Sequence, residues 1–64
     1  MPDLLRHREV ATRLGLGAST LFELVRKGEF PRPISVGRSK RYLSTEVEAW
    51  LAAKAAERHT NQGA

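Results

Sequence analysis

The sequence predicts one small domain that is mainly α-helical and contains a single β-hairpin. Three observations support this fold class. Apolar residues recur at helical spacing in three segments, glycine and prolines separate the second segment from the third, and residues 34–43 form two short runs around a glycine-containing turn. The 64 residues suffice for one domain. A chain of this length buries only about 60% of the surface that it exposes when unfolded, so its stability should be marginal.

The first predicted helix covers about residues 8–14. Gly15 stops it, and Leu16 stands between two glycines, as expected for a tight turn that tucks one side chain beneath a pair of helices. Gly17 can act as the N-cap of a second helix, although a serine would be a stronger cap. The apolar face of the first helix is formed by Val10, Ala11 and Leu14.

The second predicted helix covers about residues 18–27. Thr20 and Glu23 have the spacing of a capping box at its start. Gly28 is placed to close the helix in the left-handed conformation, and two prolines then direct the chain toward extended structure. The apolar face of this helix is formed by Leu21, Leu24 and Val25.

Two short strands are expected at residues 34–36 and 41–43, around a turn that contains Gly37 and Ser39. These strands form the hairpin. A third helix is expected to begin near Ser44 or Thr45.

Thr45 and Glu48 again have capping-box spacing, and alanines extend the third helix to about Arg58. Residues 59–64 contain no apolar anchor and are expected to form a flexible tail, so that the domain covers residues 4–58. The inward side chains of the helix are expected to be Val47, Trp50 and Leu51, with Trp50 in a structural role.

The charge is concentrated in one part of the chain. Eleven Lys and Arg residues against seven Asp and Glu give a formal net charge of +4 and a pI near 10.4, which favours a polyanionic partner. Residues 26–41 contain six basic residues and one acidic residue, a net charge of +5, and the remainder carries −1. A simpler interpretation is that short charged loops keep a small protein in solution. The helical pattern described next favours a polyanionic partner over this simpler interpretation.

Two helices joined by a short glycine-containing turn are typical of a helix-turn-helix, whose second helix enters the major groove of DNA. Arg26 could reach guanine or phosphate, Glu23 could accept a hydrogen bond from cytosine, and Phe22 could contact a thymine methyl group. Alternatively, Glu23 forms a surface ion pair with Lys27, and Phe22 flanks the core. The outer face of the second helix consists of Ser19, Phe22, Glu23, Arg26 and Lys27.

Five short pieces strengthen this interpretation by their order and spacing: REV at 8–10, STL at 19–21, GEFPRP at 28–33, GR at 37–38 and EVEAWL at 46–51. With them, residues 4–54 resemble the small AlpA-type regulators of prophages. That family shares a winged helix-turn-helix fold with phage excisionases and with the DNA-binding part of MerR-type regulators. Glu23 departs from the family pattern, which often has a basic or polar residue there.

The resemblance implies that the hairpin is a wing lying along a groove beside the recognition helix, and that the protein acts as a transcriptional regulator or as an excisionase. Its partners would be double-stranded DNA, neighbouring copies of itself and an integrase. The candidate DNA-contacting residues are therefore Ser19, Thr20, Phe22, Glu23, Arg26, Lys27, Arg38, Ser39, Lys40 and Arg41.

Other classes of function find little support. His7 and His59 are far apart in the sequence, and there is no cysteine to complete a metal site. The GLG sequence at 15–17 lacks the rest of a nucleotide-binding fingerprint. We therefore expect no enzymatic activity, no metal and no cofactor. The N-terminus does not resemble a secretion signal and no apolar run is long enough to span a bilayer, which favours a cytoplasmic protein without membrane contact. The main alternative is a small protein-interaction adaptor that uses the alanine-rich third helix.

Overall fold

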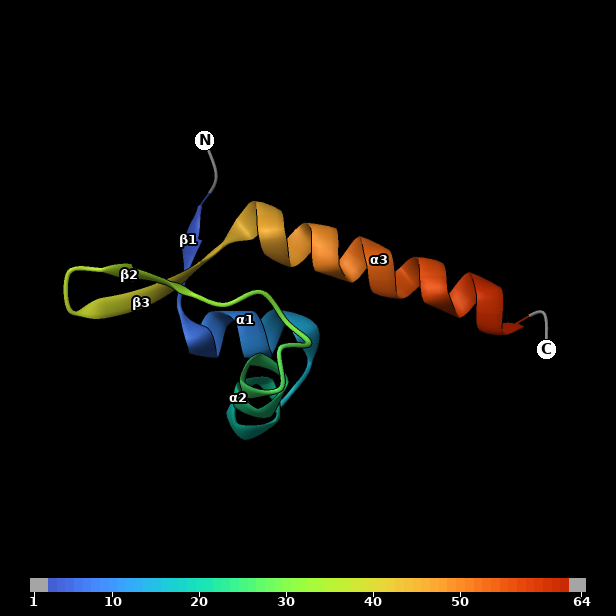
Figure 1. Ribbon diagram of the computed structural model, residues 1–64, viewed down its shortest axis with the longest axis horizontal. Helices are drawn as coiled ribbons and strands as arrows, with labels where there is room; N and C mark the ends of the chain where they lie inside the picture. Colours follow the sequence, from blue (N-terminus) through green and yellow to red (C-terminus); the bar gives the residue numbers. More distant parts are fainter. Residues whose placement is uncertain (1–2, 63–64) are drawn as a thin grey trace.

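The computed structural model describes the backbone of residues 3–62 and the side chains of residues 3–58. Three helices and a small antiparallel sheet form a winged helix-turn-helix, which confirms the predicted fold class (Figure 1). The hairpin and the third helix extend to opposite sides of the first two helices. In chain order the elements are β1 Leu4–Leu5, α1 His7–Leu14, α2 Ala18–Arg26, β2 Ile34–Val36, β3 Ser39–Leu43 and α3 Ser44–Gln62.

The sheet has three strands in the order β1-β3-β2, all pairs antiparallel. The hairpin pairs Ile34 with Arg41 and Val36 with Ser39, and its turn consists of Gly37 and Arg38. Gly37 adopts a φ of 63°, which a two-residue hairpin turn requires and which glycine accommodates without steric cost. The prediction that Ser39 lies in the turn is therefore wrong, because β3 begins at this residue. We call residues 34–43 the wing.

The helix-turn-helix follows the predicted boundaries closely. Gly15 adopts the left-handed conformation at φ 71° and ends α1, and Gly28 does the same after α2 at φ 78°. The backbone N–H of Glu29 donates to the carbonyl of Leu24 at 2.9 Å, so an otherwise unpaired carbonyl at the end of α2 is satisfied. Gly17 is the N-cap of α2, and Thr20 lies within the helix. The predicted capping box of Thr20 and Glu23 is therefore wrong.

Helix α3 is tied to the N-terminal strand where it begins. The backbone N–H of Ser44 donates to the carbonyl of Asp3, and the Ser44 hydroxyl accepts from the Asp3 N–H, both at 2.9 Å. The helix continues to Gln62, beyond the predicted end at Arg58. The flexibility of residues 59–64 stays a prediction, and residues 63 and 64 lie outside the described part.

Among the described side chains of α3, residues 44–58, only those in its first turns pack against the body of the protein. Val47 is buried and Trp50 is half-buried, whereas residues 51–58 are exposed. Leu51, predicted to point inward, is 48% exposed because this part of the helix projects past the sheet and the other helices (Figure 1).

The core lies between α1, α2, the inner face of the sheet and the start of α3. Phe30, which follows α2, contacts Tyr42 and Trp50 in edge-on geometry, with ring centroids 5.6 and 4.8 Å apart. The indole N–H of Trp50 donates to the carbonyl of Glu29 at 2.7 Å. Trp50 therefore has the predicted structural role and joins α3 to the segment between α2 and the wing. The buried apolar residues are Leu5, Val10, Ala11, Leu21, Phe30, Tyr42 and Val47.

Candidate nucleic-acid interface

Helix α2 presents one face to the core and the opposite face to solvent. Leu21 is fully buried, while Phe22 is 60% exposed. A phenyl ring this exposed does not serve the core, so the expectation that Phe22 belongs to the outer face is met. Ser19, Thr20, Arg26 and Lys27 are exposed as well. The α2 residues of the predicted interface, listed above, are therefore available to a partner.

Glu23 and Arg26 form a two-pronged ion pair on this outer face. The carboxylate accepts from Nε of Arg26 at 3.1 Å and from Nη2 at 2.9 Å. The hydrogen bonds from Arg26, with a further contribution from the charge of Lys27, hold the pKa of the Glu23 carboxyl below its ordinary value of 4.5. Arg26, rather than Lys27, is thus the ion-pair partner of Glu23. In the free protein this pairing holds the Arg26 guanidinium against the helix.

A shallow hollow of about 360 Å³ connects α2 to the wing. Phe22 and Val25 line it from α2, and Lys40 and Tyr42 line it from β3. His7, Arg32 and Pro33 complete it. Its surface is mostly apolar, with the cations of Arg32 and Lys40 among the lining residues. A partner that fits this hollow offers both apolar surface and negative charge.

Arg32 was absent from the set of predicted contact residues. It lies between two prolines, in the extended segment before β2, and is exposed. Its position within the basic window was visible in the sequence, but its proximity to α2 was not, because the path of an irregular segment carries no periodic signal.

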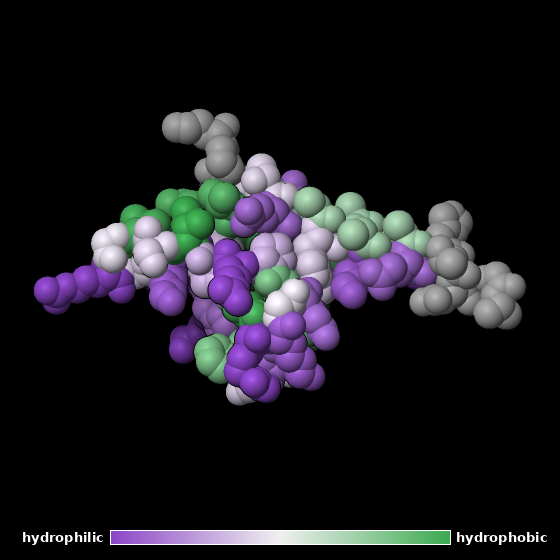
Figure 2. Space-filling view, in the orientation of Figure 1, coloured by the Kyte–Doolittle hydropathy of each residue, from purple (hydrophilic) through white to green (hydrophobic). Residues whose placement is uncertain are grey.

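The wing divides its predicted contact residues between two faces. Side chains alternate along a strand, so Lys40 shares the inner face with buried Tyr42, while Ser39 and Arg41 occupy the outer face. Nη1 of Arg41 donates to the carbonyl of Lys40 at 2.9 Å. Arg38 stands in the exposed turn at the strongly hydrophilic tip (Figure 2). The structure therefore brings Lys40 to the side of α2 and does not bring Arg41 there.

The outer face of the sheet is apolar apart from Arg41 and Ser39. Leu4, Ile34 and Val36 are 46%, 40% and 45% exposed. Their registered partners on β3 place them on the side away from the helices. Figure 2 shows hydrophobic surface over the sheet and along one side of α3.

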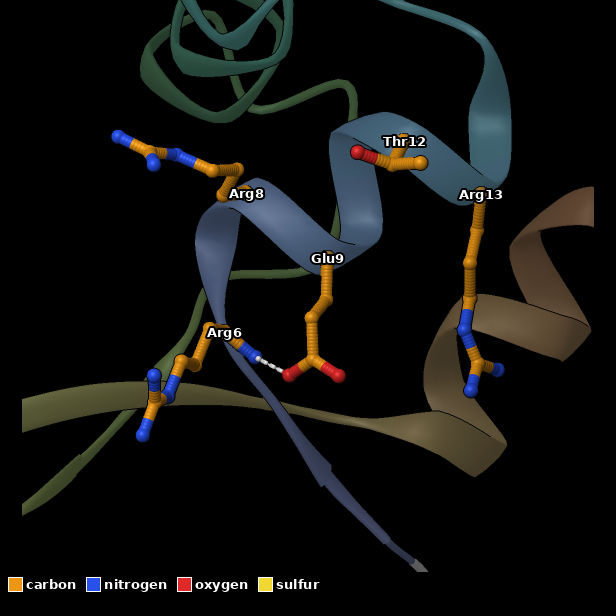
Figure 3. Close-up of a pocket in the computed structure, with 5 residues that line it drawn as sticks. All are labelled: Arg6, Arg8, Glu9, Thr12 and Arg13. Atoms are coloured by element: carbon orange, nitrogen blue, oxygen red, sulfur yellow. Dashed lines mark hydrogen bonds between the residues drawn. The ribbon is translucent and has the colours of Figure 1, made fainter.

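A second group of cations lies at the N-cap and on the outer side of α1 (Figure 3). The Glu9 carboxylate accepts from the backbone N–H of Arg6 at 3.0 Å, so it caps the helix. Among the described side chains, Arg6, Arg8 and Arg13 have no carboxylate within ion-pair distance. Figure 3 shows their guanidinium groups pointing apart, so they do not form one binding site. Counting net charge along the chain concealed this group, because acidic residues elsewhere outside the basic window cancel it.

Two further properties concern only the described part of the chain. Residues 3–58 contain no cluster of three or more His, Asp or Glu side chains that could hold a metal ion. Among the helices described, none combines the length and the apolar character needed to cross a bilayer.

Comparison with known proteins gives two similarities. The model of a family described as "Prophage CP4-57 regulatory protein (AlpA)" matches residues 3–55, most of the chain. The chain is also 42% identical over 64 residues to "Uncharacterized protein ORF88" of Enterobacteria phage P4, in a match that covers 91% of this chain and 73% of that protein. No solved structure matches the chain at a significant level.

Proposed function

Since the chain belongs to the AlpA family of prophage regulatory proteins, we propose that it is a sequence-specific double-stranded DNA-binding protein that regulates a prophage or integrative element. It acts in the cytoplasm of the bacterial host as a binding protein, without catalysis. One observation carries the proposal. The exposed face of α2 and the inner face of the wing meet at a single hollow that combines apolar surface with the cations of Arg32 and Lys40.

This geometry suits a DNA backbone that passes between a helix and a wing. With α2 in the major groove, the sugar–phosphate strand beside that groove crosses the hollow. Deoxyribose packs against Pro33 in the hollow, while Arg32 and Lys40 approach the phosphates on either side. Arg38, at the tip of the wing, reaches the next phosphate or the minor groove. These contacts position the protein and supply most of the salt-dependent affinity.

Base recognition then falls to the outer face of α2. Ser19 and Thr20 lie in its first turn, the part of a recognition helix that approaches base edges. Phe22 contacts a thymine methyl group. Arg26 reads guanine or binds phosphate once it leaves Glu23.

Glu23 acts as a filter in this proposal. Its carboxylate oxygens already accept hydrogen bonds from Arg26, and it repels phosphates that come close without a compensating base contact. A cytosine amino group that attracts Glu23 must compete with a charge-assisted pair. This favours the filter over direct reading of cytosine.

The regulatory role has two forms within one fold, control of a promoter and control of site-specific recombination as an excisionase. The second needs neighbouring copies on DNA or a contact with an integrase. The exposed residues 51–58 of α3 and the apolar outer face of the sheet are surfaces on which such protein contacts would form without disturbing the DNA face. Because of these surfaces, the second candidate function is that of a protein-interaction adaptor that binds a protein partner and no DNA.

Selection of binding sites from a random duplex library tests the proposal. We expect a single recovered motif, and affinity for it should fall steeply as salt concentration rises. Ser19→Ala should weaken binding to the motif while leaving the melting temperature nearly unchanged, because this side chain is exposed. Recovery of no motif, together with weak and sequence-independent binding, would leave the protein-contact function as the better account.

A further inference from the structure

His7 connects the two parts of the proposed DNA interface through its two ring nitrogens. It is the first residue of α1. Its Nε2 lies 2.9 Å from the carbonyl oxygen of Ala18, the first residue of α2, and its Nδ1 lies 3.1 Å from the phenolic oxygen of Tyr42 in β3. One side chain thus bridges the recognition helix and the wing.

The partners determine where the ring proton resides. A carbonyl oxygen can only accept, so Nε2 carries the hydrogen and donates it to Ala18. In neutral imidazole Nδ1 is then an acceptor, and it receives the hydroxyl hydrogen of Tyr42. Burial raises the pKa of the Tyr42 phenol, which keeps it protonated and able to donate. The bridge therefore runs in one direction, from Tyr42 through His7 to Ala18.

The bridge lies where direct packing is weak. Helix α1 packs against both α2 and β3, whereas α2 and β3 have little contact with each other. Leu21 of α2 and Tyr42 of β3 belong to the shared core, but most of the contacts that set the angle between the recognition helix and the wing run through α1. The His7 ring also packs against that of Tyr42, with centroids 5.9 Å apart, and forms part of the lining of the hollow.

We propose that His7 is a positioning residue for DNA recognition, which fixes the first turn of α2 relative to β3 so that Ser19 and Lys40 reach the same DNA site together. The role rests on the proposed function above. Phosphates beside the major groove have a fixed spacing from base edges, so a helix and a wing at the wrong angle cannot satisfy both at once. His7 contributes by maintaining that angle and not by contact with a base.

The test compares three variants for both orientation and binding. His7→Phe keeps an aromatic ring and removes both hydrogen bonds, His7→Gln keeps one donor and one acceptor, and Val47→Ala lowers stability through the core alone. The first readout needs no DNA. Residual dipolar couplings report the orientation of α2 relative to β3, and ¹⁵N spectra of the wild-type ring report whether Nε2 carries the hydrogen. The second readout is the ratio of affinities for the selected motif and a scrambled duplex.

We expect His7→Phe to rotate α2 relative to β3 and to lower the affinity ratio about 25-fold, since two hydrogen bonds are lost and each corresponds to a factor of about five. His7→Gln should restore the orientation and bring the ratio to within about threefold of wild type. Val47→Ala should change neither readout. If His7→Phe fails to fold, Tyr42→Phe removes one of the two bonds with the ring retained, and it should shift both readouts in the same direction to a smaller extent.

An unchanged α2–β3 orientation in the folded His7→Phe protein, or in the Tyr42→Phe protein where the first does not fold, overturns the positioning role whether or not DNA binds. The same conclusion follows if Val47→Ala lowers the ratio as much as His7→Phe, because loss of stability would then explain the effect. Wild-type protein that binds no duplex specifically contradicts the proposed function instead, and the orientation measurement still decides the role of His7.

Discussion

Lys40 and Arg41 are adjacent cations on one strand that face opposite sides of the sheet, and this makes them a matched pair for testing the interface. Lys40 faces α2 across the hollow, whereas Arg41 shares the outer face with Ile34. If DNA lies against α2 and the inner side of the wing, Lys40→Ala removes a phosphate contact and Arg41→Ala does not.

The expected magnitude follows from the number of cations on that side. Four exposed cations face the proposed backbone path without an ion pair among the described residues: Lys27, Arg32, Arg38 and Lys40. Four phosphate contacts correspond to a log–log salt slope of about −3.6, so affinity falls about 150-fold between 50 and 200 mM salt. Lys40→Ala should reduce the slope to about −2.7 and the loss to about 40-fold, equally for all sequences.

Fluorescence anisotropy of a labelled duplex, titrated at five or six salt concentrations, measures these slopes. The Arg41→Ala slope should equal that of wild type. A larger change for Arg41→Ala than for Lys40→Ala would refute the reasoning, because it would mean that the outer face of the wing meets DNA.

Three further predictions concern individual residues. Glu23→Gln should raise affinity for every duplex and leave the selected motif unchanged, whereas a motif altered at one base pair would show that Glu23 reads a base. Because the Glu23 pKa lies below 4.5, the pair with Arg26 is intact at neutral pH, and any stability it gives is lost only as the pH falls through that lowered pKa. Trp50→Ala should lower the free energy of unfolding by about 3 kcal/mol, which is much of the total for a domain of this size. Trp50→Phe should lower it by only about 1 kcal/mol, because this variant loses the hydrogen bond to Glu29 but keeps an aromatic ring against Phe30. Urea denaturation measures both, and equal losses would contradict the packing described here. Gly28→Ala should lower the free energy of unfolding by about 1 kcal/mol. The loss comes from the backbone φ of 78° alone, because an added Cβ meets no atom within 4 Å. An unchanged urea midpoint would mean that this backbone strain is absent.

The local features of the fold were predictable because they leave local signals. Apolar residues at i, i+3 and i+4 identified α2, and two glycines marked the ends of α1 and α2 where left-handed backbone is required. Strand β1 was not predicted, since two residues give no pattern and its pairing partner Leu43 lies far along the chain. Phe30 was also missed as a core residue, because it stands between elements where periodicity does not apply.

The candidate site shows the same division. The outer face of α2 followed from the helical repeat, but the partner of Glu23 did not, since Arg26 and Lys27 are both within helical reach and only side-chain geometry selects Arg26. Strand alternation could have separated Lys40 from Arg41, had the turn been placed at Gly37 and Arg38. The bridge from His7 to Ala18 and Tyr42 joins three elements, so no local pattern announces it.

Chemical-shift mapping of the ¹⁵N-labelled protein, titrated with its selected duplex, tests the central claim most directly. We predict that the perturbed amides cluster in α2 and in residues 32–41, while residues 51–58 of α3 and the outer side of α1 keep their shifts. Perturbations concentrated in α3 or in β1, with α2 unaffected, would contradict the account, because DNA would then meet the protein on a face other than the one formed by the recognition helix and the wing.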